Sequence, residues 1–303
     1  MEKTESINVK ESSSSNKNKS KYVLEFITEK IFMISAFVAV ISLLLIIGFV
    51  FYKGLMPFAT EGYSFIDFIF GTEWLPSSKE FGIGAMIVTS MVATVGALII
   101  GVPIGILAAI FIAEICPKKY ARVISTAVEL LAGIPSVLIF GLAVIVPAIQ
   151  TVLSLPKGQS LLAVIIVLSI MMLPTIISLS ETSIRAVPKA YKEGSLALGA
   201  SKIETIFKVT VPAAKSGILA GVILGIGRAL GETMAVILVA GNSTAMPTSL
   251  LDSARPLTTN IALEMGYAAG THQEMLFATG VVLFLFIIII NLVLTKLTSK
   301  GVD

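Results

Sequence analysis

The chain has one cysteine and one histidine, Cys116 and His272, in 303 residues. A single cysteine excludes an internal disulfide and a multi-cysteine metal site. A single histidine excludes most zinc sites and most Ser/His/Asp catalytic arrangements, so we expect neither a metal centre nor catalytic residues. No Gly-Lys dipeptide occurs, and the phosphate-binding GxxxxGK[ST] loop of many ATPases is therefore absent. If ATP drives this chain, the ATP is bound by another subunit.

Charged residues are also scarce. Only 14% of the residues are charged, whereas 55% are hydrophobic, and the mean hydropathy is +0.95. Such a chain is too apolar for a soluble domain of this length, which indicates an integral membrane protein. The formal net charge of +3 gives no reason to expect a nucleic-acid partner. The composition predicts an all-α polytopic membrane protein.

Six apolar segments are long enough to cross a membrane, since a spanning helix needs about 20 residues. They cover residues 31–52, 82–115, 124–149, 161–179, 214–240 and 275–297. The first is longer than the apolar core of a signal peptide, and no small-x-small cleavage site follows it, which favours a retained span. Gly133-Ile134-Pro135 interrupts the third and predicts a kink there. Glu129, before that kink, is either interfacial or a second functional charge.

The segments outside these spans are polar. Residues 1–30 contain many Lys and Ser residues and are predicted to form a disordered tail. The segment 53–81 follows the first span, and residues 241–274 form a second polar loop. Phe65, Phe68, Ile69 and Trp74 predict a short interfacial helix, with Trp74 at the level of the lipid headgroups.

The positive charges favour one orientation. Lys and Arg gather in residues 1–30, 118–122 and 185–215 and at the C-terminus, whereas the alternate loops hold only Lys53, Lys79, Lys157 and Arg255. Positive residues favour the cytoplasmic side, so both termini, including the tail 298–303, are predicted to be cytoplasmic.

A charged segment, YKEGSLALGASKIETIFKVTVP at 191–212, separates the fourth and fifth spans. Residues 193–198 favour helix, Gly199 permits a turn, and Ser201 with Glu204 forms the pattern of a capping box. Ile203, Ile206 and Phe207 then form an apolar stripe, and Pro212 is expected to end the helix. The segment is either an amphipathic linker on the membrane surface or a docking site for a soluble partner.

Two charges lie inside the fifth span. Arg228 and Glu232 are four residues apart, so on a continuous helix they share a face. An intramembrane arginine costs about 2.5–3.5 kcal/mol on insertion scales and needs a partner or a cavity. The two residues either pair with each other or form an anion site. In the second case the arginine would bind a tetrahedral oxyanion bidentately, and Glu232 would accept a hydrogen bond from a protonated phosphate oxygen.

Glycines recur every four residues before Arg228, at Gly217, Gly221 and Gly225, with Gly227 and Gly231 around it. Small residues at this spacing allow close helix packing. Packing against a neighbouring helix is the favoured interpretation, and backbone contact with a substrate is the alternative.

The charged segment resembles the cytoplasmic loop of ABC-importer permeases, which reads Glu-Ala-Ala, a glycine four residues later, and a distal Ile-x-Leu-Pro. Both alanines are replaced, by Gly194 and Ser195, and the aliphatic positions are valines. In that family the loop is the coupling helix that docks into the ATPase subunit. The resemblance assigns ATPase coupling to Glu193, Gly194, Ser195, Gly199, Val209 and Pro212.

Residues 31–297 resemble more specifically the PstC-type permeases of phosphate ABC transporters. The resemblance rests on GRALGETMAVILVAGN (227–242), ELLAGIPS (129–136), TEWLP (72–76) and the coupling loop. It implies a MetI-like type I importer permease with its core at 83–297 and its coupling loop at 185–213, after a first transmembrane helix and extracytoplasmic segment at 31–82. It places Arg228 and Glu232 at charged positions considered important for transport.

The same resemblance implies the partners and the location. These are a PstA-like second permease, two PstB-like ATP-binding subunits that hydrolyse the ATP, and an extracytoplasmic PstS-like phosphate-binding protein, all at a prokaryotic cell membrane. The chain itself would be a transport subunit and not an enzyme. Two alternatives stay open: an ABC permease for another oxyanion such as molybdate or sulfate, and an ion-coupled secondary transporter. The latter often shows internal repeats, which are not evident in this sequence.

Overall fold

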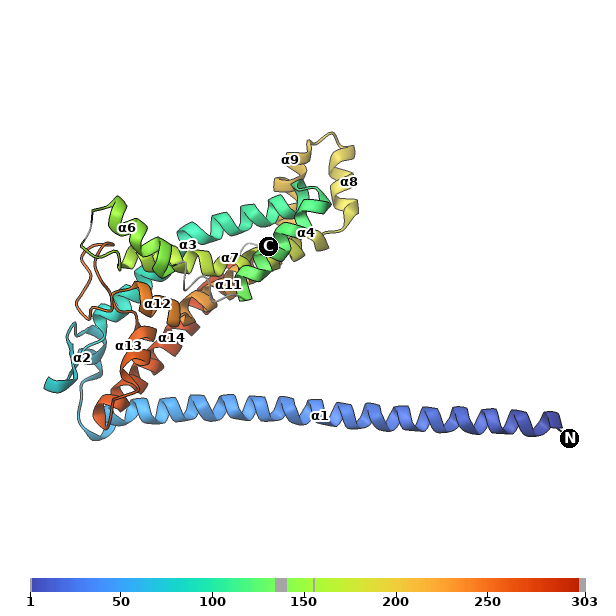
Figure 1. Cartoon of the computed structure of the whole chain (residues 1–303), viewed down its shortest axis with the longest axis horizontal. Coiled ribbons are helices and arrows are strands. Elements are labelled where there is room, and N and C mark those ends of the chain that lie inside the picture. Colours follow the sequence, from blue (N-terminus) through green and yellow to red (C-terminus); the bar gives the residue numbers. More distant parts are fainter. Residues whose placement is uncertain (1, 134–140, 155, 300–303) are drawn as a thin grey trace. The chain divides into compact units, whose positions relative to one another are not determined.

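The computed structural model describes residues 2–133, 141–154 and 156–299, and this part is helical apart from one two-stranded ribbon (Figure 1). The α-helices are α1 (Glu2–Thr60), α2 (Phe65–Phe70), α3 (Gly84–Ile110), α4 (Lys118–Gly133), α6 (Val146–Val152), α7 (Leu161–Ala186), α8 (Lys189–Ala197), α9 (Lys202–Thr205), α10 (Val211–Ala213), α11 (Lys215–Gly231), α12 (Met234–Val239), α13 (Leu257–Glu264) and α14 (Thr271–Ser299). Strands β1 (Trp74–Leu75) and β2 (Glu80–Phe81) are antiparallel around the 3-10 turn η1 (Pro76–Ser78), and π-helical turns occur at η2 (Phe111–Ile115), η3 (Gly141–Ile145) and η4 (Ile206–Thr210).

The chain divides into two units at Tyr52 and Lys53. In the first unit α1 runs from Glu2, so residues 2–30 are helical where the composition predicts a disordered tail. Neither glycine nor proline occurs before Gly48. Adding residues to an existing helix is far easier than nucleating one, which allows the apolar span to extend into the polar stretch.

In the second unit, α7 lies at the centre of the helix packing, with α3 and α11 against it (Figure 1). The predicted packing role of the glycines is confirmed. A Cβ atom at Gly225 would lie 2.9 Å from Cγ1 of Ile176 on α7, and one at Gly221 would lie 3.1 Å from Cβ of Leu179. Ile176 is fully buried. The small residues of α11 therefore allow it to approach α7 closely.

The described ranges contain four or five of the six predicted spans. In the described ranges four helices are long and apolar enough to cross a membrane: Glu25–Thr60, Gly84–Ile115, Leu161–Ala186 and Thr271–Val293. A fifth is present if Lys202–Ala213 and Lys215–Gly231, which are bent by 69°, are counted together. The third predicted span, 124–149, includes residues 134–140, which lie outside the described residues, and so does its predicted kink.

The segment before α3 corrects one prediction. A short helix does form at Phe65–Phe70, but Trp74 lies on β1 and is only 3% exposed. Its ring packs edge-on against Phe81, its partner across the ribbon, with 5.5 Å between the centroids. Trp74 is thus a buried core residue on the ribbon and is not part of the short helix.

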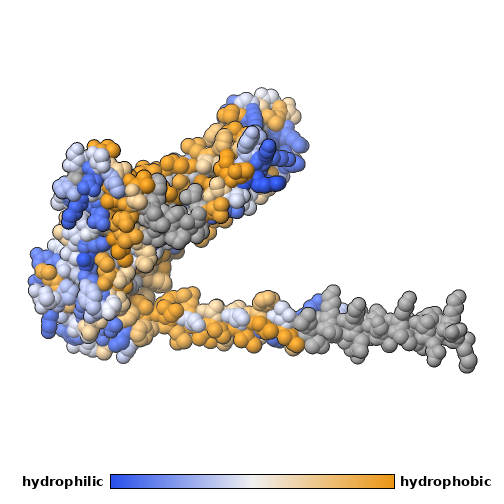
Figure 2. Space-filling view, viewed as in Figure 1, coloured by the Kyte–Doolittle hydropathy of each residue, from blue (hydrophilic) through white to orange (hydrophobic). Residues whose placement is uncertain are grey.

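Side-chain polarity in the second unit follows the fold. Figure 2 shows hydrophilic residues over the end that carries α8 and α9 and over the opposite end, with hydrophobic residues between them. An apolar band between two polar ends is typical of a multi-pass membrane protein.

Candidate coupling loop, broken span and outer cluster

The coupling loop forms two helices joined by a turn. Helix α8 is followed by Gly199, whose φ of +88° is a left-handed conformation that favours glycine. The predicted capping box is confirmed: the Ser201 hydroxyl accepts from the backbone N–H of Glu204, and the Glu204 carboxylate accepts from that of Ser201. The helix does not end at Pro212. Proline is tolerated in the first turn of α10, and the break comes at Ala214.

Two polar contacts hold this loop in place. Lys192 on α8 forms an ion pair with Glu114 in η2, which ties the loop to the end of α3. The hydroxyls of Ser195 and Thr205 lie 3.0 Å apart and connect α8 to α9. The first contact escaped prediction because its partners are 78 residues apart in the sequence.

The coupling loop exposes several large apolar side chains among its polar ones. Leu198 is 91% exposed, and Leu196, Ile203 and Phe207 are about half exposed, whereas Ile206 of the predicted stripe is buried. Glu193 and Gly194 are also exposed, and Val209 is half-buried. A cluster of exposed large apolar side chains is typical of a protein–protein contact surface.

The capping box should stabilise α9 locally. We expect Ser201→Ala to destabilise this turn by about 1 kcal/mol, because the N–H of Glu204 loses its acceptor. The pKa of Glu204 is lowered, first by the hydrogen bonds from Ser201 and then by Lys208. A lowered pKa means that the carboxylate's contribution is present above its unfolded pKa and is lost as the pH falls through the folded value. The protection factors of the amides of residues 202–205, which are corrected for the intrinsic pH dependence of exchange, should therefore fall in acid and in Ser201→Ala; equal protection in both proteins would contradict this.

A second charged cluster lies at the same end of the helices. The hydroxyl of Ser125 on α4 donates to the Glu181 carboxylate at 3.0 Å, and Arg185 pairs with Glu181 at 2.9 Å. Arg185 also donates to the carbonyl of Ile112 at 3.1 Å. Glu181 and Arg185 thus join α4, α7 and the end of α3 beneath the coupling loop.

The fifth span is broken between its two predicted site residues. Helix α11 ends at Gly231, and Glu232 has an extended backbone with φ −71° and ψ 124°. The prediction that Arg228 and Glu232 share one helix face is therefore wrong, because the helix ends before Glu232. The Glu232 carboxylate accepts from the N–H of Ala235 at 3.2 Å and forms no ion pair with Arg228 in the described part of the chain.

Arg228 lies on an exposed face of α11. Leu224 and Gly231, one turn before and after it on the helix, are also exposed, and a Cβ atom at Gly227 or Gly231 would meet no atom of the described residues within 4 Å. The glycines at 217, 221 and 225 face α7, and this second set of small residues faces away from it. Arg228 thus lies on the face of α11 that is turned away from α7.

A small cavity adjoins Glu232. Its lining includes the hydroxyl side chains of Ser90, Thr94 and Thr258, and its volume is about 20 Å³. This is room for about one water molecule.

A buried charge cluster, called the outer cluster below, lies at the end of the helices opposite the coupling loop. It consists of Glu264, Arg255, Trp74 and His272. The Glu264 carboxylate pairs with Arg255 at 2.6 Å and accepts from Trp74 Nε1 and His272 Nε2, each at 2.8 Å. Arg255 also donates to Asn260 Oδ1 at 3.1 Å. This cluster was not predicted, although TEWLP contains Trp74. In the described ranges, no three His, Cys, Asp or Glu side chains come together as metal ligands.

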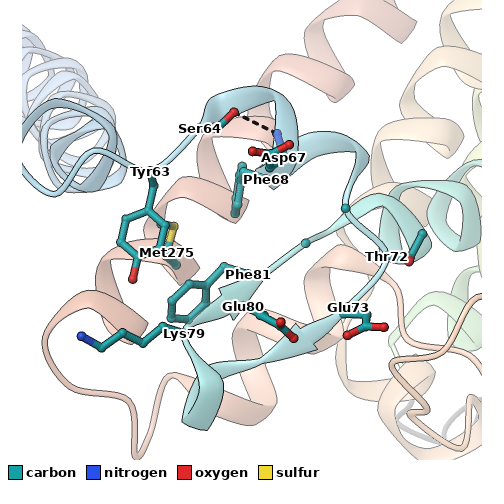
Figure 3. A pocket seen from close by; sticks show the side chains of 12 residues that line it. Tyr63, Ser64, Asp67, Phe68, Thr72, Glu73, Lys79, Glu80, Phe81 and Met275 are labelled. Carbon is teal, nitrogen blue, oxygen red and sulfur yellow. Dashed lines mark hydrogen bonds between the residues drawn. The ribbon is translucent and has the colours of Figure 1, made fainter.

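Residues of the segment before α3 also line an open pocket of about 450 Å³ (Figure 3). In Figure 3, Asp67 with Ser64 and Glu73 with Glu80 lie at different parts of the rim, with the rings of Phe68 and Phe81 between them. Ser64 accepts from the N–H of Asp67 at 3.3 Å. Gly71 and Gly82 approach so closely that a Cβ atom at Gly82 would lie 2.4 Å from the carbonyl carbon of Gly71.

Comparison with known proteins places these features in a family. Residues 101–300 match the family model described as "Binding-protein-dependent transport system inner membrane component". The chain belongs to this family. It is thus a multi-pass membrane protein, and the MetI-like permease core predicted from its coupling loop is confirmed.

Its relatives are permeases. It is 43% identical over 249 residues to the "Probable ABC transporter permease protein YqgH" of Bacillus subtilis, covering 79% of this chain and 81% of the relative. It is 36% identical over 290 residues to the "Phosphate transport system permease protein PstC" of Mesorhizobium japonicum, covering 87% and 88%. For PstC of Haemophilus influenzae the identity is 35% over 261 residues, covering 78% and 83%. The predicted resemblance to PstC-type permeases is confirmed.

Solved structures of this family share the fold. A bacterial ABC transporter involved in the import of the acidic polysaccharide alginate aligns with a TM-score of 0.56 at 16% identity, over 87% of this chain and 96% of that chain. An inward-facing MetNI methionine ABC transporter aligns with a TM-score of 0.50 at 19% identity, over 73% and 95%. At these identities the likeness concerns the fold alone.

Proposed function

We propose that this permease is the transmembrane subunit of an ATP-driven, binding-protein-dependent importer of inorganic phosphate. The observation that carries the proposal is its similarity, over most of its length, to permeases named for phosphate transport. The exposed arginine on α11 agrees with it, because a guanidinium fork matches two oxygens of a tetrahedral oxyanion.

The partners implied by the family resemblance can be assigned to surfaces of the second unit. A PstB-like ATPase would dock on the exposed apolar side chains of the coupling loop. A PstA-like second permease would cover the face of α11 that carries Arg228, so that this residue lies on the path between the two permeases. A PstS-like phosphate-binding protein would deliver its ligand to the opposite end, formed in part by residues 53–81 and 241–274. Both termini would be cytoplasmic, as the distribution of Lys and Arg predicts.

In this mechanism Arg228 and Glu232 have separate tasks. Because α11 ends between them, the guanidinium is presented on the helix surface, while the carboxylate stands at the break and caps α12. Arg228 would bind phosphate oxygens, and Glu232 would accept a hydrogen bond from a protonated one. Transport requires a state in which this site is accessible and binds tightly and another in which it binds weakly.

Uptake of radiolabelled phosphate tests the proposal. Vesicles would hold the full complex, with the binding protein outside, ATP inside or absent, and excess sulfate as the competitor. We expect uptake that requires ATP and the binding protein and that resists sulfate. Sulfate-sensitive uptake would indicate another oxyanion, and uptake without ATP or partners would indicate an ion-coupled transporter.

A further inference from the structure

The Glu264 carboxylate joins parts of the chain that are far apart in the sequence. Its Oε2 atom accepts from Trp74, 190 residues earlier, and from His272 at the start of α14, and its Oε1 atom pairs with Arg255. Glu264 is only 6% exposed. A buried carboxylate is costly unless its oxygens are paired, so this arrangement is stable only while the donors stay in place.

Helix α13 connects the Glu264 carboxylate to the break in the fifth span. It is eight residues long, about 12 Å, and Glu264 is its last residue. At its first residues, the N–H of Leu257 donates to Ser90 Oγ on α3 at 3.0 Å, and Thr258 Oγ1 donates to the backbone carbonyl of Glu232 at 3.3 Å. One short helix therefore connects the outer cluster to the break between α11 and α12.

The far end of α12 is tied to the same carboxylate. Nε of Arg255 donates to the carbonyl of Asn242 at 2.9 Å, while its Nη1 holds Glu264. The N–H of Ala254, next to Arg255, donates to the carbonyl of Ala240 at 2.9 Å. Glu264 thus constrains α12 from both sides, through Thr258 at its start and through Arg255 at its end.

We infer that Glu264 is a positioning residue for transport: together with Trp74 and His272 it holds α13 so that Thr258 fixes the backbone of Glu232. The inference rests on the proposed function, because it takes the break at Glu232 to be part of the transport path. The small cavity supports it, since Thr258 and Glu232 line the same cavity. If α13 is displaced, the backbone of Glu232, which is bonded to Thr258, moves with it. The Glu232 carboxylate is then displaced although residue 232 itself is not mutated.

A double-mutant cycle tests the inference. Uptake would be measured in vesicles with the full complex for Glu264→Gln, Thr258→Val and the double variant. Glu264→Gln keeps the shape of the side chain but removes its charge, and Thr258→Val removes only the hydroxyl. We expect Glu264→Gln to lower the maximal rate about tenfold and Thr258→Val to lower it at least threefold. Because both act through Glu232, the double variant should be at most about twofold slower than Glu264→Gln.

The control is a carboxylate of the same region. Glu274 on α14 pairs with Lys53 at 3.4 Å, and its carboxylate forms no hydrogen bond or ion pair with α13 in the described residues. Glu274→Gln should lower the rate less than twofold, and its effect should multiply with that of Thr258→Val. The binding-protein concentration that gives half the maximal rate should stay within twofold of wild type in Glu264→Gln, because docking is not affected.

Effects of Glu264→Gln and Thr258→Val that multiply would overturn the inference, because the two residues would then act independently. So would an effect of Glu264→Gln equal to that of Glu274→Gln. If Glu264→Gln does not reach the membrane, Trp74→Phe replaces it in the cycle, since this change removes the donor but keeps the aromatic packing on Phe81. The anion that wild type transports is measured first and used throughout, which separates a wrong substrate from a wrong role of Glu264.

Discussion

Arg228→Gln should reduce phosphate uptake about 100-fold or more. A neutral side chain cannot replace the bidentate, charge-assisted hydrogen bonds of a guanidinium, and each hydrogen bond to a charged group contributes about 1.5–3 kcal/mol. Two such bonds correspond to a factor of about 100 or more, since 1.4 kcal/mol is tenfold. The side chain is exposed on α11.

Arg228→Lys is the matched variant. It keeps the charge and loses the planar fork, so uptake should lie between those of wild type and Arg228→Gln. Membrane abundance and co-purification with the partner subunits should be the same for all three proteins. Full uptake in Arg228→Gln would exclude Arg228 from the phosphate path.

Glu232→Gln separates the second residue of the pair from the first. If the carboxylate accepts a hydrogen bond from a protonated phosphate oxygen, its replacement should weaken the preference for phosphate over sulfate. The amide can still cap α12 through its oxygen, so the break in the span should persist. An unchanged preference would limit Glu232 to the structural role of capping α12.

Local features of this fold could be predicted from the sequence, and contacts between distant segments could not. Ser201 and Glu204 are three residues apart, and their capping box forms as expected because every participating atom lies within one helical turn. The glycines at 217, 221 and 225 pack as expected because their spacing follows the helical period.

The break after Gly231 could not be predicted from the apolar pattern of the fifth span. The apolar pattern continues from 214 to 240, so it favours one straight helix, and Arg228 and Glu232 then fall on one face. The backbone instead becomes extended at Glu232, where the carboxylate caps α12 and the carbonyl accepts from Thr258. The second of these interactions depends on a loop that returns 26 residues later, so no local pattern indicates it.

The outer cluster was missed for the same reason. Glu264 meets Trp74, 190 residues away, and the burial of that tryptophan depends on the ribbon formed by β1 and β2. A lone tryptophan beside a span is most often a headgroup anchor, which favoured placing Trp74 in an interfacial helix. The family resemblance identified TEWLP as a shared segment, but only the structure shows that Trp74 in this segment donates to Glu264.

The two ends of the second unit make different contacts with the helices between them. At the coupling loop, Lys192 and Glu114 link α8 to the end of α3, and Glu181 and Arg185 lie beneath. At the opposite end, α13 links Glu264 to Glu232 and, through Ser90, to α3. Helix α3 and the turn η2 that follows it therefore contact both sets, through Ser90 near one end and Glu114 near the other.

Leu198→Asp should abolish ATP-dependent uptake by preventing attachment of the ATPase. Leu198 is 91% exposed, so the change leaves this chain's own packing intact. Burying a leucine at an interface contributes about 1.5–3 kcal/mol. Burying an unpaired carboxylate in its place costs several kcal/mol more. Together these terms should weaken association with the ATPase at least about 100-fold.

Co-purification of the ATPase subunits with the permease measures this directly, with uptake as the second measurement. Leu198→Met keeps an apolar side chain of similar size and should retain both. Leu250→Asp places the same charge on an exposed leucine of the loop between α12 and α13, and it should leave ATPase co-purification unchanged whatever its effect on uptake. If Leu198→Asp kept the ATPase and still lost uptake, Leu198 would act in transmitting the ATPase movement to the helices. If it kept both, the apolar surface of α8 and α9 would not be the docking site.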